Sequence, residues 1–245
     1  MGSDGAVVFF HAHPDDESIF TGGTIARCVA SGRRAILVVA TSGGLGRPAP
    51  RCARLEERRE DETREAASIL GLHRVEFLRY PDSGMRGDPC NNEAGRFSTL
   101  AADDAATRLA TILREEHAAA LVSYDRSGIY GHPDHVQVHV VGRLAARLAP
   151  VPTLYEATVD REYLHFVGPH LVERACRGRA RDLGVGAPSV AITTTVPVGE
   201  HFGTKRRAIR AHRSQVPPAR LDPAVYGFEW YMRRGEAGAL DALAV

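Results

Sequence analysis

The sequence has 245 residues, enough for one sizeable α/β domain. Its 31 basic and 30 acidic residues leave a net charge of +1, so the composition gives no reason to expect nucleic acid or an anionic membrane as a partner. It contains no apolar run of about eighteen residues, which predicts no transmembrane helix, and no charged-then-apolar leader, which predicts no secretory signal.

Apolar segments alternate with segments of helical pattern through most of the chain. We expect strands at 6–12, 34–42, 75–81 and 119–125, and helices at 21–32, 54–72, 99–117 and 136–148. These strands are apolar on both faces, which is typical of a parallel sheet covered on both sides. With right-handed crossovers, they predict an α/β fold with a Rossmann-like, doubly wound, mostly parallel sheet.

The last third of the sequence is less regular. It predicts strands at 152–160 and 189–198 and a basic helix at 203–215. We expect a single domain over 1–245, with a core at about 1–150 and a C-terminal extension at about 151–245 that closes one side of the site. The polar connection 82–98 is long enough to be functional or mobile.

The four cysteines, Cys28, Cys52, Cys90 and Cys176, are widely and irregularly spaced. No CxxC pair occurs, which argues against a cysteine zinc site. The cysteines therefore predict free thiols in a reducing cytoplasm.

Two clusters of titratable residues follow predicted strands. "HAHPDDE" leaves the first strand and "YGHPDH" leaves the fourth. Ligands of doubly wound sheets bind at the carboxyl ends of strands, so we expect these loops to meet. His13 and Asp16 are spaced to converge on one ion, and His135 adds a third ligand. Two histidines and one carboxylate are typical of catalytic zinc with one position open, although Fe²⁺ fits the same ligands.

Asp15 lies beside the expected ligand Asp16 and is free for another role. We expect it to act as general base and then general acid, on the acid limb of a bell-shaped pH profile. The alternative is a helix N-cap, for which aspartate is well suited. Glu17 is expected in the first helical turn. His11 is expected to be a polar end to the strand, with a supporting position behind the ligands as the alternative.

The second loop offers groups for stabilising an oxyanion. His132 is expected to face the developing charge as an imidazolium, with Asp134 hydrogen-bonded to it and raising its pKa. Tyr130 could donate its hydroxyl to the same oxygen, or simply pack on the loop.

Three other segments suggest weaker hypotheses. "GGLG" (43–46) is similar to a nucleotide-binding glycine loop but lacks the GxGxxG spacing. A nucleotide-binding dehydrogenase is therefore kept only as the structural alternative. The mixed charges of "RLEERREDETRE" indicate a solvated helix face. "KRRAIRAHR" has no aromatic interleaving, which argues against nucleic acid.

Taken together, "HAHPDDES" and "YGHPDHVQVH" resemble the two signature segments of the zinc-dependent GlcNAc de-N-acetylases, the PIG-L or LmbE-like family. Weaker pieces agree in order over most of the chain, namely the spaced set Arg59, Glu62, Ala66, Leu70 and Gly71, then "PDSGM" (81–85), "LYEAT" (154–158), and the set Lys205, Ala208, His212, Ser214 and Gln215. The "DSGM" piece resembles the actinobacterial mycothiol branch.

This resemblance implies zinc at His13, Asp16 and His135, Asp15 as base and acid, and His132 as oxyanion stabiliser. It also implies that Arg59, Asp82 and Ser83 contact a small amino-sugar substrate, an N-acetylglucosaminyl-inositol or an antibiotic sugar. The loop 86–98 is expected to vary with substrate, and a homo-oligomer is compatible with the family. Amide cleavage on a larger conjugate, or a catalytically silent sugar or metal binder, are the alternatives.

Overall fold

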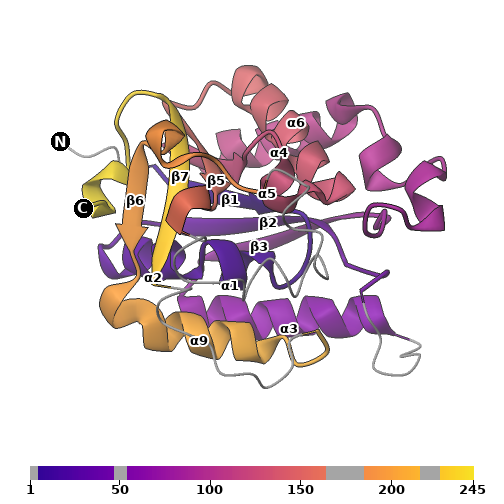
Figure 1. Ribbon diagram of the computed structural model, residues 1–245, viewed down its shortest axis with the longest axis horizontal. Coiled ribbons are helices and arrows are strands. Elements are labelled where there is room, and N and C mark those ends of the chain that lie inside the picture. The colour runs from indigo at the N-terminus through magenta and orange to yellow at the C-terminus, as the bar shows by residue number, and fades with distance from the viewer. Residues whose placement is uncertain (1–4, 47–53, 164–184, 216–226) are drawn as a thin grey trace.

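The computed structural model describes residues 5–46, 54–163, 185–215 and 227–245. A seven-stranded sheet lies between two layers of helices, with the strand order β3-β2-β1-β4-β5-β7-β6 (Figure 1). The strands are β1 (Val7–His11), β2 (Ala35–Thr41), β3 (Arg74–Tyr80), β4 (Ala120–Tyr124), β5 (Thr153–Thr158), β6 (Thr194–Pro197) and β7 (Phe228–Gly235). The helices are α1 (Asp16–Phe20), α2 (Gly22–Ala30), α3 (Leu55–Leu70), α4 (Ala102–Glu115), α5 (Gly128–Gly131), α6 (Pro133–Leu148) and α9 (Phe202–Ala211).

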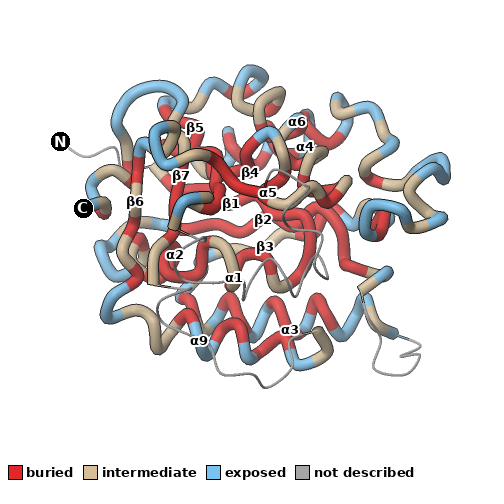
Figure 2. Tube along the Cα trace, viewed as in Figure 1, coloured by how far each residue is buried: buried red, intermediate tan, exposed pale blue. Residues whose placement is uncertain are grey.

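The first five strands form the predicted parallel sheet. β1 pairs with β2 on one side and β4 on the other, with Val7 aligned with Ala35 and Ala120. Every residue of β1, β2 and β4 is buried, because α4 and α6 cover one face while α1, α2, α3 and α9 cover the other (Figure 2). The doubly wound α/β fold is thus confirmed, and with it the carboxyl edge on which the site was expected.

The far side of the sheet differs from the prediction. The strand expected at 189–198 is only β6, preceded by a 3₁₀ turn at Ser189–Ala191. The sequence analysis missed β7, which runs antiparallel to both β5 and β6. The described part of the C-terminal extension therefore continues the sheet of the core. No helix in the described ranges has the length and apolarity needed to cross a bilayer.

Two helix boundaries differ near the site. The segment between the expected strand at 119–125 and the expected helix at 136–148 contains the single turn α5, and α6 begins at Pro133 rather than at 136. Proline suits the first position of a helix, because no partner exists there for the amide it lacks. The basic helix α9 ends at Ala211, so that residues 212–215 turn away from its axis.

Cys28 and Cys90 are free thiols, as expected, whereas Cys52 and Cys176 lie outside the described residues.

A buried ion pair joins the extension to the core. Glu229 of β7 accepts hydrogen bonds from the amides of Gly23 and Thr24, at the start of α2, and from Nζ of Lys205 in α9 at 2.6 Å. Glu229 and Lys205 are both buried, at 2% and 1% exposure. The lysine of the basic segment is therefore structural in this fold.

The Glu229→Gln variant is expected to lower the free energy of unfolding by about 3–5 kcal/mol, because it removes the carboxylate that compensates a buried ammonium. Urea denaturation measures this loss. Glu65→Gln is the control, since Glu65 pairs with Arg213 on the protein surface. Losing this exposed pair should change the free energy of unfolding by about 1 kcal/mol or less. Equal stability of the two variants would contradict the prediction.

Candidate metal and active site

The two histidine-rich loops meet at the carboxyl edge of the sheet. The first follows β1 and the second follows β4, which lie side by side and parallel. The ring centroids of His13 and His132 are 4.5 Å apart, and those of His13 and His135 are 5.3 Å apart. The predicted convergence of the loops is therefore observed.

Two of the three predicted metal ligands, His13 and His135, approach one carboxylate oxygen of the third, Asp16. Oδ2 of Asp16 lies 3.5 Å from Nδ1 of His13 and 3.3 Å from Nε2 of His135. Two ligands of one tetrahedral zinc ion, each at its usual bond length, are about 3.3 Å apart, so these spacings fit zinc. All three side chains are buried. Although burial opposes it, the imidazoles of His135 and His13 hold the pKa of Asp16 well below its ordinary value.

Further donors lie on the other side of His13. Its Nε2 is 3.1 Å from Oδ2 of Asp134 and 3.6 Å from Oδ1 of Asp82. A carboxylate at the second nitrogen of a histidine ligand fixes the tautomer and leaves the first nitrogen free for a metal. His13 can therefore present Nδ1 to an ion while Asp134 holds Nε2.

The cluster as a whole could hold a metal. In the described part of the chain, two sets of buried donor atoms lie within 4.8 Å of one another, and these are His13, His132 and His135, and His13, Asp82, His132 and Asp134. Oδ1 of Asp134 and Nδ1 of His135 are buried without a hydrogen-bond partner among the described residues. Orphaned polar atoms of this kind are typical of a site completed by an ion or water.

Asp15 occupies the N-cap position of α1 but does not cap it. Its side chain makes no capping hydrogen bond, so the N-cap alternative is wrong. The carboxylate is 17% exposed and lies 3.5 Å from Nη2 of Arg59. Burial raises the pKa of Asp15 to about 6, against the lowering effect of Arg59. A carboxylate with this pKa can exchange protons near neutral pH.

The expected pairing of Asp134 with the His132 ring is wrong. Because α6 begins at Pro133, the Asp134 carboxylate instead accepts hydrogen bonds from His13 and from the amide of Ser83. Nδ1 of His132 accepts the Asp134 amide and caps α6. Burial, with the neighbouring imidazoles of His13 and His135, lowers the pKa of His132 well below its ordinary value. An Nδ1 that accepts a hydrogen bond favours a ring with its proton on Nε2 over the expected imidazolium.

Tyr130 lies against the cluster on a tightly held loop. Its hydroxyl is 3.4 Å from Nε2 of His135. The preceding residue, Ile129, has a φ of 66°, which is rare for a β-branched residue. Asp125 holds this turn, because its Oδ1 accepts from the amides of Ser127 and Ile129.

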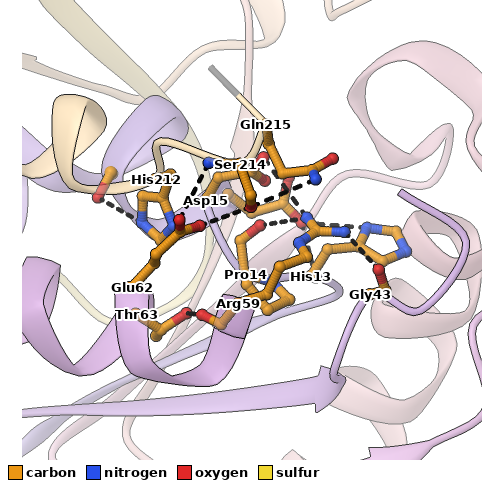
Figure 3. Close-up of polar contacts among 12 residues, drawn as sticks. His13, Pro14, Asp15, Gly43, Arg59, Glu62, Thr63, His212, Ser214 and Gln215 are labelled. Carbon is orange, nitrogen blue, oxygen red and sulfur yellow. Dashed lines mark hydrogen bonds and ion pairs between the residues drawn. The ribbon is translucent and has the colours of Figure 1, made fainter. Parts of the chain in front are cut away.

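Arg59 is buried beneath the Asp15 loop. Its Nη1 donates to the carbonyl of Gly43 at 2.7 Å and its Nη2 to that of Pro14 at 2.6 Å (Figure 3). A Cβ added to Gly43 would lie 2.1 Å from the guanidinium, and one added to Gly46 would lie 2.4 Å from it. The "GGLG" segment therefore has glycine where it packs against the Arg59 guanidinium, because a side chain at Gly43 or Gly46 would collide with it.

The other two predicted substrate contacts, Asp82 and Ser83, are buried under the cluster. Asp82 accepts from the amides of Gly84 and Leu45, and Ser83 accepts at Oγ from the amide of Ser98. Both residues are thus bonded to the protein, and they tie the 82–98 connection to the site.

Sequence reasoning missed a second buried pair next to Asp15. Glu17 is fully buried, and its Oε1 is 2.7 Å from Nε2 of His212, the residue that follows α9. Although burial opposes it, Glu17 raises the pKa of His212. The only sequence signal for this contact was the position of His212 in the family-like spacing of the extension.

His11 ends β1 next to Tyr124, whose ring stacks on that of His135. It is buried between the hydroxyls of Tyr124 and Thr21, at 2.7 and 2.9 Å, and burial lowers its pKa to about 4.

A family model described as PIG-L, GlcNAc-PI de-N-acetylase, matches residues 8–146, more than half of the chain and including both histidine-rich loops. The chain belongs to this de-N-acetylase family. It is 37% identical to the 1D-myo-inositol 2-acetamido-2-deoxy-alpha-D-glucopyranoside deacetylase of Thermomonospora curvata, over 90% of this chain and 84% of that protein.

Solved structures share the fold of this PIG-L family member. The N,N'-diacetylchitobiose deacetylase from Pyrococcus horikoshii aligns with a TM-score of 0.63 at 21% identity, covering 94% of this chain and 83% of that one. The zinc inhibited form of teicoplanin deacetylase aligns with a TM-score of 0.61 at 15% identity, covering 95% and 100%.

Proposed function

We propose that this chain is a zinc-dependent N-deacetylase of an N-acetylglucosaminyl-inositol conjugate, releasing acetate and a free amine. The observation that carries the proposal is the convergence of His13, Asp16 and His135 beside the Asp15 carboxylate, which does not cap the helix that it precedes. The substrate follows from the 37% identity, over nearly the whole chain, to a deacetylase named for that conjugate.

We propose His13, Asp16 and His135 as the metal ligands. Two imidazoles and one carboxylate suit zinc, and Fe²⁺ is the alternative occupant. Bound zinc supplies a Lewis acid that polarises the acetamide carbonyl and lowers the pKa of water.

Asp15 is proposed to move the proton. Its carboxylate takes a proton from the attacking water and then gives it to the amine that leaves the sugar. Three features support this role, namely its place next to Asp16, its freedom from helix capping and its greater exposure than the ligands.

His132 is proposed to stabilise the oxyanion as a neutral donor. With Nδ1 occupied by the Asp134 amide, the ring carries its proton on Nε2, which can donate to the developing negative charge. The hydroxyl of Tyr130 is the second candidate donor. Asp134 acts one step away, by fixing His13.

We propose that Arg59 and Ser83 support the site rather than touch substrate, because both are buried and bonded to the protein. The sugar contact of Asp82 implied by the family stays a prediction, as does selection of the substrate by loop 86–98. Because β7 and β6 continue the sheet of the core, we further propose one domain over residues 1–245.

The test is amine release from a panel of N-acetylglucosaminyl-inositol, N-acetylglucosamine and an N-acetylated aminoglycoside fragment. The zinc-loaded protein is expected to prefer the inositol conjugate, and chelation should lower the rate by at least about 100-fold until zinc is restored. Release that survives full metal removal would contradict the proposal. Zinc binding without any release would favour a larger amide substrate or a silent binder.

A further inference from the structure

The backbone at Asp15 has a conformation that residues with side chains rarely adopt. Its φ is 100°, and such strain persists only where the surroundings impose it. Two contacts flank the strained position. Nη2 of Arg59 donates to the carbonyl of Pro14 on one side, and the Asp15 amide donates to Oε2 of Glu17 at 3.1 Å on the other. These contacts hold the backbone on both sides of Asp15, whose carboxylate lies 3.5 Å from Nη2 of Arg59.

Glu17 is itself held by the C-terminal extension. Its Oε1 contacts Nε2 of His212 at 2.7 Å and accepts from the hydroxyl of Ser18 at 2.5 Å. Glu17 and His212 are fully buried and lie 195 positions apart in the chain. A single hydrogen-bonded path therefore runs from the end of α9 through Glu17 to the amide of Asp15.

The same end of α9 also contacts the helix that carries Arg59. The amide and hydroxyl of Ser214 donate to the carboxylate of Glu62 in α3, at 3.0 and 2.6 Å. Figure 3 shows His212, Ser214 and Gln215 together beside Asp15 and Arg59. The extension thus contacts the elements on both sides of the strained residue.

We propose that His212 is a positioning residue for Asp15, acting through Glu17 to hold the Asp15 carboxylate in its working direction. The proposal rests on the proposed function, in which Asp15 moves the proton. Removing the His212 contact frees the Glu17 carboxylate to turn, and the Asp15 amide loses its fixed acceptor. A displacement of about 1 Å at a reacting group can cost about 100-fold in rate.

Two substitutions of equal polarity separate positioning from packing. In His212→Gln, the terminal amide nitrogen can occupy the place of Nε2 and still donate to Glu17. In His212→Asn, the amide nitrogen corresponds to Nδ1, which has no hydrogen-bond partner among the described residues. The asparagine side chain is too short to reach Glu17. Arg213→Ala is the matched control, because Arg213 is the next residue and pairs with the exposed side of Glu65.

The experiment measures kcat, KM, bound zinc and thermal midpoint with N-acetylglucosaminyl-inositol. His212→Asn is expected to lower kcat by about 10–100-fold with KM and zinc unchanged, whereas His212→Gln and Arg213→Ala keep most of the wild-type kcat. Wild-type kcat in His212→Asn would overturn the inference. So would equal losses in Asn and Gln variants that track a lowered thermal midpoint, since these indicate packing alone.

A crystal structure of His212→Asn gives a readout that does not need turnover. Asp15 is expected to leave its φ near 100° for an ordinary value. An unmoved Asp15 would overturn the positioning role even if no substrate had been found. Conversely, an inactive wild-type protein with full zinc would reject the proposed function, while the backbone of this variant would still decide the inference about His212.

Discussion

Asp15→Asn is expected to lower kcat by about 10²–10⁴-fold while the protein keeps its full metal content. The amide of asparagine has nearly the same shape as the carboxylate but cannot accept the proton of the attacking water. Metal content should hold because the expected ligands are His13, Asp16 and His135, and the nitrogens of the two histidines lie next to Oδ2 of Asp16.

Asparagine is chosen for the backbone as well as for the chemistry. With a φ of 100° at this position, alanine would combine a lost carboxylate with new strain, whereas asparagine tolerates positive φ better than most residues. Steady-state kinetics and metal analysis on the same preparation measure the two effects separately.

Asp61→Asn serves as the control for this variant. Asp61 is an exposed carboxylate of α3 paired with Arg64, so its loss should leave both kcat and metal unchanged. Near-normal turnover in Asp15→Asn would remove Asp15 from the mechanism. Loss of metal would instead make it a ligand or a support of one.

The parallel core was predictable because its signals are local. β1, β2 and β4 are fully buried, so their sequences are continuous apolar runs that need no partner to be recognised. The position of each histidine-rich segment directly after such a run then placed both at one edge of the sheet. The family and the presence of a metal cluster could therefore be inferred from the sequence alone.

The individual partners in the site were not predictable in the same way. Whether Asp134 faces His132 or His13 depends on the residue at which α6 begins. With α6 beginning at Pro133 rather than 136, the carboxylate contacts His13 in the loop after β1. The protonation of His132 follows from the same shift, because the ring caps the helix instead of pairing with a carboxylate.

The extension was the least predictable part, because its elements are defined by distant contacts. β7 mixes aromatic residues with three charged ones and ends in glycine, and its pairing with β5 and β6 defines it as a strand. The contact of His212 with Glu17 spans 195 positions, and no periodicity reports such a pair. Residue spacing places His212 in the set that resembles the family, but it does not predict which residue His212 contacts.

The second large effect is expected on metal binding. Substitutions of the neighbouring α6 residues His135 and Asp134 should lower zinc affinity by different amounts. His135→Ala removes a proposed ligand whose Nε2 lies 3.3 Å from Oδ2 of Asp16, and it is expected to abolish stable zinc binding. Asp134→Asn removes only the charge that holds Nε2 of His13, and such outer partners typically cost about 10–100-fold in metal affinity.

Competition with a chromophoric chelator measures both affinities, and His201→Ala is the control, since that imidazole lies near Glu200 and outside the cluster. The order of the effects is the diagnostic result. If His135→Ala kept full zinc occupancy, the ion would have to lie on the other side of His13, among Asp82, His132 and Asp134. Asp134→Asn would then be the more damaging change, because Asp134 would itself be a ligand rather than the carboxylate that orients one.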